Sequence, residues 1–405
     1  MKIVGWRQAS AQTQHAFASR TACRRCGWKY SLVLRYRSTA TYKSDDRTVW
    51  VRSLYLVILL LLPTGHFDLK AEDALLPPPE VIRRPTGLSA VPYPVRNPPT
   101  PEKIALGAKL FSDPRLSIDG AMSCASCHDP AHAFTNPKPP VRPGVIDTRL
   151  RRDVPSLLNV AYATPLHHDG GEPSLEAQML APLFNAAEMG NTTFDDLSDR
   201  LAALAEYRNA FDKVFASRPT SENLGHALAA FERSLIAADS PFDRWSAGGD
   251  EAALSPEASS GFKLFTGKAG CAACHPIDAQ SAIFSANAFV NTGVGYMSEA
   301  RRAAETPEAL SDRGREEITH KREDRYKFRT PTLRNVALTA PYMHDGSLKT
   351  LDDVIAYYNA GGSVDPEQDA RVKPLGLTEA EQKQLLAFLK SLTSSNLPGG
   401  AERVP

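Results

Sequence analysis

Cys124-Ala125-Ser126-Cys127-His128 and Cys271-Ala272-Ala273-Cys274-His275 are the two stretches that decide the fold of this 405-residue chain. Each is a C-x-x-C-H motif, in which two thiols can bond to the vinyl groups of one haem while the histidine ligates its iron. A single C-x-x-C could instead be half of a zinc site or a thioredoxin-like redox pair. Because histidine follows both times and no other cysteine lies downstream, the sequence predicts two covalently bound haems c, with His128 and His275 as iron ligands.

The N-terminal 71 residues have the features of an export signal. Residues 53–62, SLYLVILLLL, form an apolar run that is too short to span a bilayer and matches a signal-peptide core, with cleavage near Ala71. The run begins unusually late, so translation could start near residue 49 or 51, or residues 1–48 could be a long basic leader. Cys23 and Cys26 lack a following histidine and are not a third haem site. We expect a periplasmic protein.

The charge of the chain is unevenly distributed. Residues 1–71 carry 12 of the 47 Lys and Arg residues but only 3 of the 46 Asp and Glu residues, so the remainder is acidic by about eight charges. Such an excess can simply solvate the surface, or it can steer a basic partner protein. The composition does not suggest nucleic-acid binding or a membrane span in the mature chain.

The rest of the chain repeats the same order of motifs twice. Residues 154–160 and His168-Asp169-Gly170 match residues 330–336 and His344-Asp345-Gly346 at an offset of 176 residues. Residues 107–111 match residues 261–265 upstream of each haem motif. An internal duplication of two cytochrome c-type domains follows.

The predicted organisation is all-α. We expect a proline-rich arm at 72–99, an N-terminal haem domain at 100–247 and a C-terminal haem domain at 248–397. Thr100 and Ser255, each followed by proline, and Thr378 with Glu381 three residues later, predict helix N-termini. The stretches 193–207 and 223–237 are predicted helices as well.

The sixth ligand of each iron separates the two halves. Tyr358 lies 14 residues after His344 on a predicted helix, and the residue 14 positions after His168 is Pro182. Because proline has no side-chain donor atom, the second iron can be six-coordinate while the first stays open. Tyr358 could equally be an ordinary core tyrosine.

The chain resembles the bacterial di-haem cytochrome c peroxidases, and among them the MauG-like branch. The resemblance covers about residues 100–395 and rests on residues 110–117, both haem motifs, Glu176-Ala177-Gln178, Glu188-Met189 and residues 341–346. It implies two all-α cytochrome c domains, with a peroxidatic haem in the first and an electron-transfer haem in the second.

The resemblance also implies roles for single residues. It makes Tyr358 the axial ligand of the second iron, with Met343 and Met297 as competing ligands. It makes Glu188 and Gln178 the groups that assist O–O cleavage beside Pro182, although Glu188 could instead be a solvated or helix-capping acid.

Two departures and one further site follow from the same resemblance. The family usually has tryptophan where this chain has His168, and imidazole relays an electron hole less readily than indole. The only histidine between residues 129 and 152 is His132, so we expect no blocking histidine at the first haem. Asp153, Thr339 and Pro341 stand at the positions of a possible interdomain calcium ion, although a simple interdomain hydrogen bond would explain Asp153 equally well.

The leading hypothesis is a periplasmic di-haem peroxidase that reduces hydrogen peroxide at the open N-terminal haem. A small cytochrome c or cupredoxin would supply electrons through the C-terminal haem. The alternatives are MauG-type oxidation of a protein substrate and a non-catalytic di-haem electron carrier, which predicts two six-coordinate haems.

Overall fold

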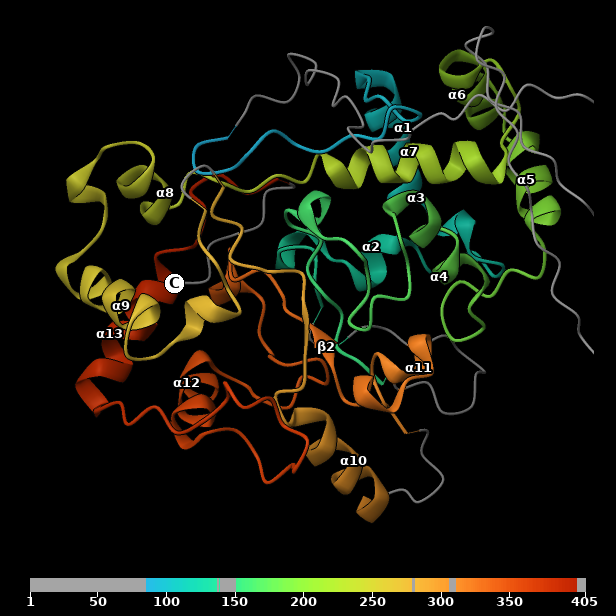
Figure 1. The fold of residues 1–405 in the computed structure, drawn as a ribbon. Helices are drawn as coiled ribbons and strands as arrows, with labels where there is room; N and C mark the ends of the chain where they lie inside the picture. Colours follow the sequence, from blue (N-terminus) through green and yellow to red (C-terminus); the bar gives the residue numbers. More distant parts are fainter. Residues whose placement is uncertain (1–84, 137, 139–150, 279–280, 306–310, 399–405) are drawn as a thin grey trace, which may run out of the picture. The chain divides into compact units, whose positions relative to one another are not determined.

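Helices make up nearly all of the regular structure (Figure 1). The computed structural model describes residues 85–136, 138, 151–278, 281–305 and 311–398, which belong to one unit spanning Asp73–Pro405. The predicted signal segment, Cys23, Cys26 and the first part of the arm lie outside the described residues. No helix in the described ranges is long and apolar enough to cross a membrane.

The helices are α1 (Pro101–Phe111), α2 (Cys124–Cys127), α3 (Leu175–Gln178), α4 (Ala181–Phe184), α5 (Phe194–Ala203), α6 (Ala205–Phe215), α7 (Ser221–Arg233), α8 (Pro241–Ser246), α9 (Pro256–Thr266), α10 (Val294–Glu305), α11 (Glu316–Thr319), α12 (Leu351–Ala360) and α13 (Glu379–Lys390). Two short strands, β1 (Phe289–Val290) and β2 (Phe328–Arg329), pair antiparallel. The expectation of a helix-rich fold with little strand is therefore confirmed.

Two helix pairs make the most extensive contacts between helices: α1 packs against α7, and α9 packs against α13. Both crossings depend on glycine. A Cβ added at Gly107 would overlap the carbonyl oxygen of Ala227, and one at Gly261 would overlap the carbonyl oxygen of Gln384. The backbones of each pair therefore approach too closely for any larger residue.

Each helix pair borders its own hydrophobic core. The fully buried members of the first core include Leu110, Leu197, Tyr207, Phe211, Leu224 and Leu228. The second is rich in aromatic rings, with Phe242, Phe265, Phe284 and Phe388 at its centre. Cys124 packs against the first core and Cys271 against the second, so each attachment motif has an apolar wall.

The predicted helix starts are present. Thr100 accepts a hydrogen bond from Lys103 N and Ser255 from Ala258 N, with proline at the first helical position in both helices. Thr378 and Glu381 form the predicted capping box of α13. These side chains satisfy backbone N–H groups that have no partner inside the helix.

The prediction of one helix over 193–207 is wrong in one respect, because the helix is interrupted at Leu204. The backbone of Leu204 is extended (φ −82°, ψ 114°), so α5 ends and α6 begins there. The turn lets Tyr207 and Phe211 of α6 enter the same core as Leu201 of α5. The second predicted helix, 223–237, is α7 and ends at Arg233.

The described part of the arm, residues 85–99, crosses both halves of the chain without helix or strand. The Gly87 oxygen accepts from Ala282 N (3.0 Å), and Ser89 N donates to Ser281 Oγ (3.2 Å). Further along, Asn97 Nδ2 donates to Glu176 Oε1 (2.8 Å). The arm is thus fixed to the second half at one end and to the first half at the other.

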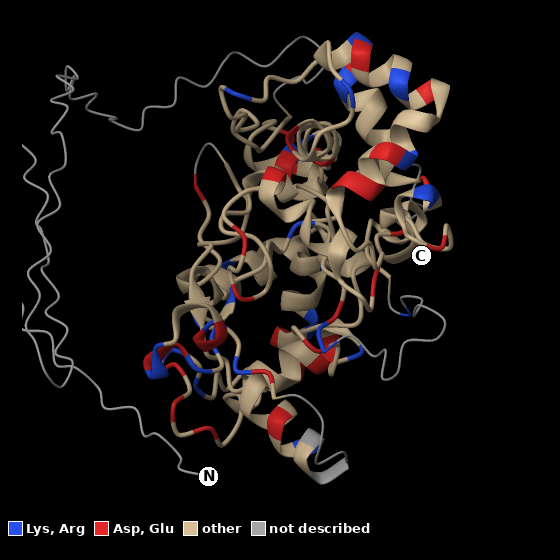
Figure 2. Ribbon diagram, turned by 90° about the vertical axis from the view of Figure 1, so that its right-hand side faces the viewer, with Lys and Arg blue, Asp and Glu red and all other residues tan. Residues whose placement is uncertain are grey.

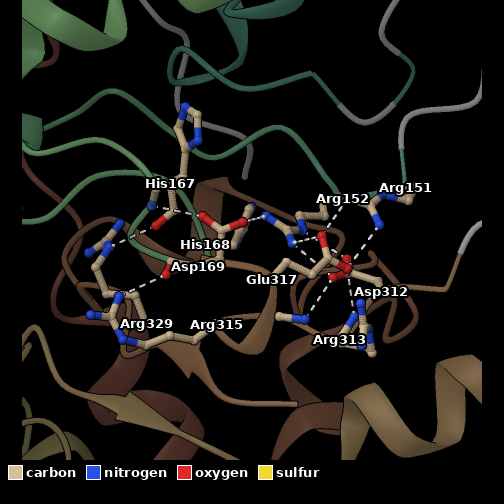
Figure 3. A network of polar contacts seen from close by, with 12 residues as sticks. Arg151, Arg152, His167, His168, Asp169, Asp312, Arg313, Arg315, Glu317 and Arg329 are labelled. Carbon is tan, nitrogen blue, oxygen red and sulfur yellow. Dashed lines mark hydrogen bonds and ion pairs between the residues drawn. The ribbon is translucent and has the colours of Figure 1, made fainter. Parts of the chain in front are cut away.

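A buried ionic network also joins the two halves (Figure 3). The guanidinium of Arg152 makes two 2.8 Å hydrogen bonds to Asp312 and a third to Asp169. Its side chain is 15% exposed and that of Asp312 is 1% exposed. Burial opposes ionisation of Asp312, but the bonds from Arg152 hold its pKa well below the usual range.

Candidate haem sites

The first C-x-x-C-H motif forms a single helical turn. α2 begins at Cys124 and ends at Cys127, and His128 N donates to Cys124 O (2.9 Å). The His128 Nδ1–H donates to the carbonyl oxygen of Phe134 (3.1 Å). Because this bond fixes the proton on Nδ1, Nε2 keeps the lone pair that an iron ligand needs.

The second motif repeats this arrangement. A short 3-10 turn at Cys271–Ala273 leads to His275, whose N donates to Cys271 O (3.0 Å). Its Nδ1–H donates to the carbonyl oxygen of Phe284 (2.8 Å). Phe134 and Phe284 both have positive φ angles, 58° and 53°, which bulky residues rarely adopt. Both loops accept this strain where they orient a histidine.

The environment of these residues fits haem c. Burial lowers the pKa of both His128 and His275, and this favours the neutral ring that coordinates a metal. All four cysteines are partly exposed and unpaired, so their sulfur atoms are free for thioether bonds. A cavity of about 370 Å³ is lined by Cys271, Cys274 and His275 of the second half and also by residues of the first half, among them Asp153 and His168. Its mixed polar and apolar walls are typical of a cofactor pocket.

Around the first motif, the predicted catalytic residues lie on one short stretch, α3 to the end of the loop after α4. Gln178 ends α3, and its Oε1 is buried with no hydrogen-bond partner among the described residues. Glu188 accepts a bond from Asn185 Nδ2 (2.7 Å). Burial raises the pKa values of Cys124 and Cys127, and the charge of Glu188 adds to both shifts. Burial raises the pKa of Glu188 itself, although the bond from Asn185 opposes the shift.

Pro182 lies in α4 between these two residues. Its carbonyl oxygen accepts a bond from Met189 N (3.2 Å), which draws the residues after α4 back over the helix. Because its side chain offers no donor atom, Pro182 could ligate no metal. The unpaired Gln178 Oε1 marks a place where a bound group could supply the missing partner.

In the second half, α12 places Tyr358 on the wall of the cavity that His275 also lines. Burial raises the pKa of this phenol, and the Cys271 and Cys274 thiols lie close enough to add to the shift. Of the two competing methionines, Met343 lines the cavity, whereas Met297 is 39% exposed on α10. Tyr358 and Met343 are therefore the candidate ligands opposite His275.

The predicted calcium positions, Asp153, Thr339 and Pro341, all line the same cavity, as does His168. Asp153 N donates to His344 O (2.7 Å), and His168 donates from Nε2 to Asp153 O (3.0 Å). Burial raises the pKa of Asp153 to about 6. Within the described ranges, no cluster of three or more His, Cys, Asp or Glu side chains could hold a metal.

The remaining predicted features are on the surface. His132 bonds the carboxylate of Asp129 (2.8 Å) and its side chain is 57% exposed, so it lies away from a buried axial position. Acidic residues occur on most helices, with Lys and Arg interspersed among them (Figure 2).

Two residues of these sites had not been predicted from the sequence. Arg329 lines the cavity and donates to His167 O (3.2 Å) and Asn287 Oδ1 (3.3 Å), with no carboxylate in ion-pair distance among the described residues (Figure 3). Glu232 on α7 is 4% exposed, and its Oε2 has no hydrogen-bond partner within the same described ranges. No local sequence pattern distinguishes either residue, because Arg329 stands between Phe328 and Thr330 and Glu232 between Phe231 and Arg233.

The matched motifs and their partly buried, Nδ1-bonded histidines define a two-domain c-type cytochrome. The family model described as di-haem cytochrome c peroxidase matches residues 101–251, and the cytochrome c model matches residues 258–393. The chain belongs to the di-haem cytochrome c peroxidase family, MauG-like members included, and is an oxidoreductase of peroxidase type.

Similar proteins support this assignment. The chain is 39% identical to the methylamine utilization protein MauG of Methylorubrum extorquens, over 77% of this chain and 83% of that protein. It is 39% identical to the cytochrome-c peroxidase IdrP1 of Denitromonas iodatirespirans, over 85% and 93%. A crystal structure of a MauG-like protein associated with microbial copper homeostasis matches with a TM-score of 0.64 and 33% identity, over 78% and 95%. The domains of this family imply haem c as cofactor.

Proposed function

We propose that the protein reduces hydrogen peroxide at a haem attached to Cys124 and Cys127, with electrons that enter through a haem attached to Cys271 and Cys274. One observation carries the proposal, the asymmetry between Pro182 and Tyr358. Tyr358 lines the cavity of His275 and its phenol oxygen can ligate iron, whereas Pro182 has no side-chain atom that could. One site is closed and the other is open to a small ligand.

The haem supplies, when bound, an iron that takes peroxide and accepts electrons. Glu188 holds a proton near the Cys127 side of the site, and its raised pKa makes proton exchange near neutral pH easier than for an ordinary glutamate. Gln178 offers an amide with an unused acceptor oxygen for orienting peroxide or its water product. Glu188 would move the proton from the inner to the outer oxygen of peroxide, so that water departs.

Several finer inferences accompany this function. We infer a periplasmic location, since residues 53–62 resemble a signal-peptide core. The equivalent glycine crossings at Gly107 and Gly261 support an origin by internal duplication, with one domain at 100–247 and the other at 248–397. Asp153, with the carbonyl oxygens of Thr339 and Pro341, would hold calcium. The electron donor would be a small cytochrome c or a cupredoxin, attracted by the acidic surface.

Electron paramagnetic resonance of the oxidised holoprotein tests the proposal. We expect a high-spin ferric signal beside a low-spin one, and loss of the high-spin signal after one equivalent of peroxide. Two low-spin signals that peroxide leaves unchanged would overturn the proposal of an open N-terminal haem and would leave an electron carrier, or a peroxidase that needs reductive opening. Peroxide turnover should then be measured once with a reduced cytochrome c and once with a protein substrate. Turnover with the cytochrome alone indicates a peroxidase, and turnover with the protein substrate indicates MauG-type activity.

Matched variants assign the two signals. Pro182→Met supplies a thioether at the open position and should convert the high-spin signal to low spin, with loss of the peroxide reaction. Tyr358→Phe removes the phenol oxygen and should convert the other signal to high spin. The proposal fails if Pro182→Met leaves both signals and the peroxide reaction intact.

A further inference from the structure

Glu232 is a buried acid that the proposed function does not use. It lies in the last turn of α7, where the helix dipole disfavours a negative charge. It is 4% exposed, and its Oε2 has no hydrogen-bond partner among the described residues. A buried carboxyl oxygen without a partner is costly, so its presence at this place points to a bound group that is its neighbour.

The position of Glu232 on α7 directs it to the first haem site. Seven residues separate it from Gly225, and two helical turns therefore bring both to nearly the same face. A Cβ at Gly225 would lie 2.8 Å from Glu176 O, so this face packs on α3, the helix that ends in Gln178. Burial is the main cause of the raised pKa of Cys124, and a carboxylate at Glu232 is close enough to add to it. Glu232 thus lies between α3 and the attachment motif.

The second half offers a natural comparison. Phe231-Glu232-Arg233-Ser234-Leu235 of the first half aligns with Phe388-Leu389-Lys390-Ser391-Leu392 of the second. The alignment holds in space, because a Cβ at Gly107 would meet Phe231 Cβ at 2.8 Å and one at Gly261 would meet Phe388 Cβ at 2.8 Å. Leu389 is 7% exposed, so an apolar residue fills the equivalent position. The carboxyl group is a feature of the first site alone.

The charged groups around Glu232 leave it without a strong counter-ion. Arg233, on its own helix, makes an ion pair with Glu176 of α3 (2.5 Å), which in turn lies near Lys103 of α1. Burial is the largest influence and raises the pKa of Glu232 to about 8; Arg233 opposes the shift and Glu176 adds to it. The carboxyl group is therefore neutral at pH 7.

We propose that Glu232 is a proton-holding residue of the N-terminal haem pocket that couples the charge of that haem to proton uptake. The inference rests on the proposed function only in requiring a haem at Cys124 and Cys127. One electron from the donor reduces ferric to ferrous iron, and one proton from solvent converts the Glu232 carboxylate to the acid, so charge is balanced. Below about pH 8 the acid is already present, and reduction there needs no proton at this residue.

Redox titration of the purified holoprotein from about pH 6 to about pH 10 tests the coupling. The potential of the N-terminal haem should be nearly constant at the acidic end. It should then fall with rising pH, with a slope that approaches 59 mV per pH unit for one proton per electron. In Glu232→Gln this fall should disappear, while the C-terminal haem keeps its own pH dependence.

Three controls make each outcome decisive. Glu222→Gln removes an exposed acid from the same helix and should leave the fall intact. Glu232→Leu copies the second half and should behave as Glu232→Gln does. A fall that survives both Glu232 variants assigns the proton elsewhere, for example to a haem propionate, and overturns the inference. Haem content measured first separates this result from a failure of the proposed function, in which no N-terminal haem would be present.

Discussion

Replacement of Arg152 by alanine should destabilise the holoprotein strongly. The guanidinium makes two 2.8 Å bonds to Asp312, which is 1% exposed, and also pairs with Asp169, which is 8% exposed. Without Arg152, the Asp312 carboxylate stays buried, and among the described residues the Gly314 N–H is then its one remaining hydrogen-bond donor (3.0 Å). Removing one member of a buried ion pair costs about 3–5 kcal/mol, so we expect a loss of unfolding free energy of that size.

Urea unfolding followed by circular dichroism measures this loss, with haem content checked beforehand. Arg313→Ala is the matched control, because Arg313 is adjacent to Asp312 but 48% exposed, and its pair with Glu316 spans 3.3 Å. An exposed pair contributes at most about 1 kcal/mol. Asp312→Asn in the Arg152→Ala background should recover part of the loss, since it removes the stranded charge. A loss below about 1 kcal/mol for Arg152→Ala would refute the reasoning.

Four further predictions concern single residues. Glu188→Gln should slow peroxide turnover by about 10²–10⁴-fold in stopped-flow assays. Wild-type turnover should fall as pH drops through the raised pKa of Glu188, because the carboxylate is the proton acceptor. Equal turnover rates in the wild type and the variant would rule out this role. Gly261→Ala should lower the unfolding free energy by about 1–3 kcal/mol or more, since its Cβ overlaps the Gln384 carbonyl; an unchanged thermal midpoint would contradict the close crossing. Calcium at about 100 times its Kd should stabilise the wild type by about 2.7 kcal/mol in calorimetry and should leave Asp153→Ala unchanged. The effect should be lost below about pH 6, where Asp153 is protonated. Equal stabilisation of the two proteins by calcium would exclude the site. Because the pKa of Glu232 is raised in the folded state, its stabilising contribution is present below about pH 4 and is lost as pH rises toward 8. Relative to Glu232→Gln, the wild type should lose about 3 kcal/mol of unfolding free energy between about pH 4 and about pH 7. Parallel curves of unfolding free energy against pH for the two proteins would contradict this.

Local chemistry in the sequence was enough to predict much of the fold. Capping by Thr100, Ser255 and Thr378 depends on side chains within three residues of the backbone groups that they bond, so a short pattern contains the information. The haem motifs could be predicted for the same reason, because both histidines follow their cysteines directly in the sequence. The break at Leu204 could not be predicted, since it depends on which side chains of the following helix enter the core.

Interactions between distant residues were the least predictable part of the site. Arg152 and Asp312 are 160 residues apart, and no local pattern distinguishes them from surface charges. Glu232 looks like any helical glutamate until its burial is known. By contrast, Tyr358 could be proposed as a ligand from the sequence, because its helix can be aligned with the equivalent position in the first half, where Pro182 stands.

The arm has a consequence for the order in which the chain assembles. Ser89 and its partner Ser281 are 192 residues apart, and Gly87 bonds the next residue, Ala282. When synthesis proceeds from the N-terminus, the arm emerges long before these partners exist, and closing so long a loop is slow compared with forming local helices. Its last contacts can form only after synthesis has reached Ala282 in the second half. The start of the described chain is therefore made 192 residues before its partner Ser281, and it lacks these contacts throughout that interval.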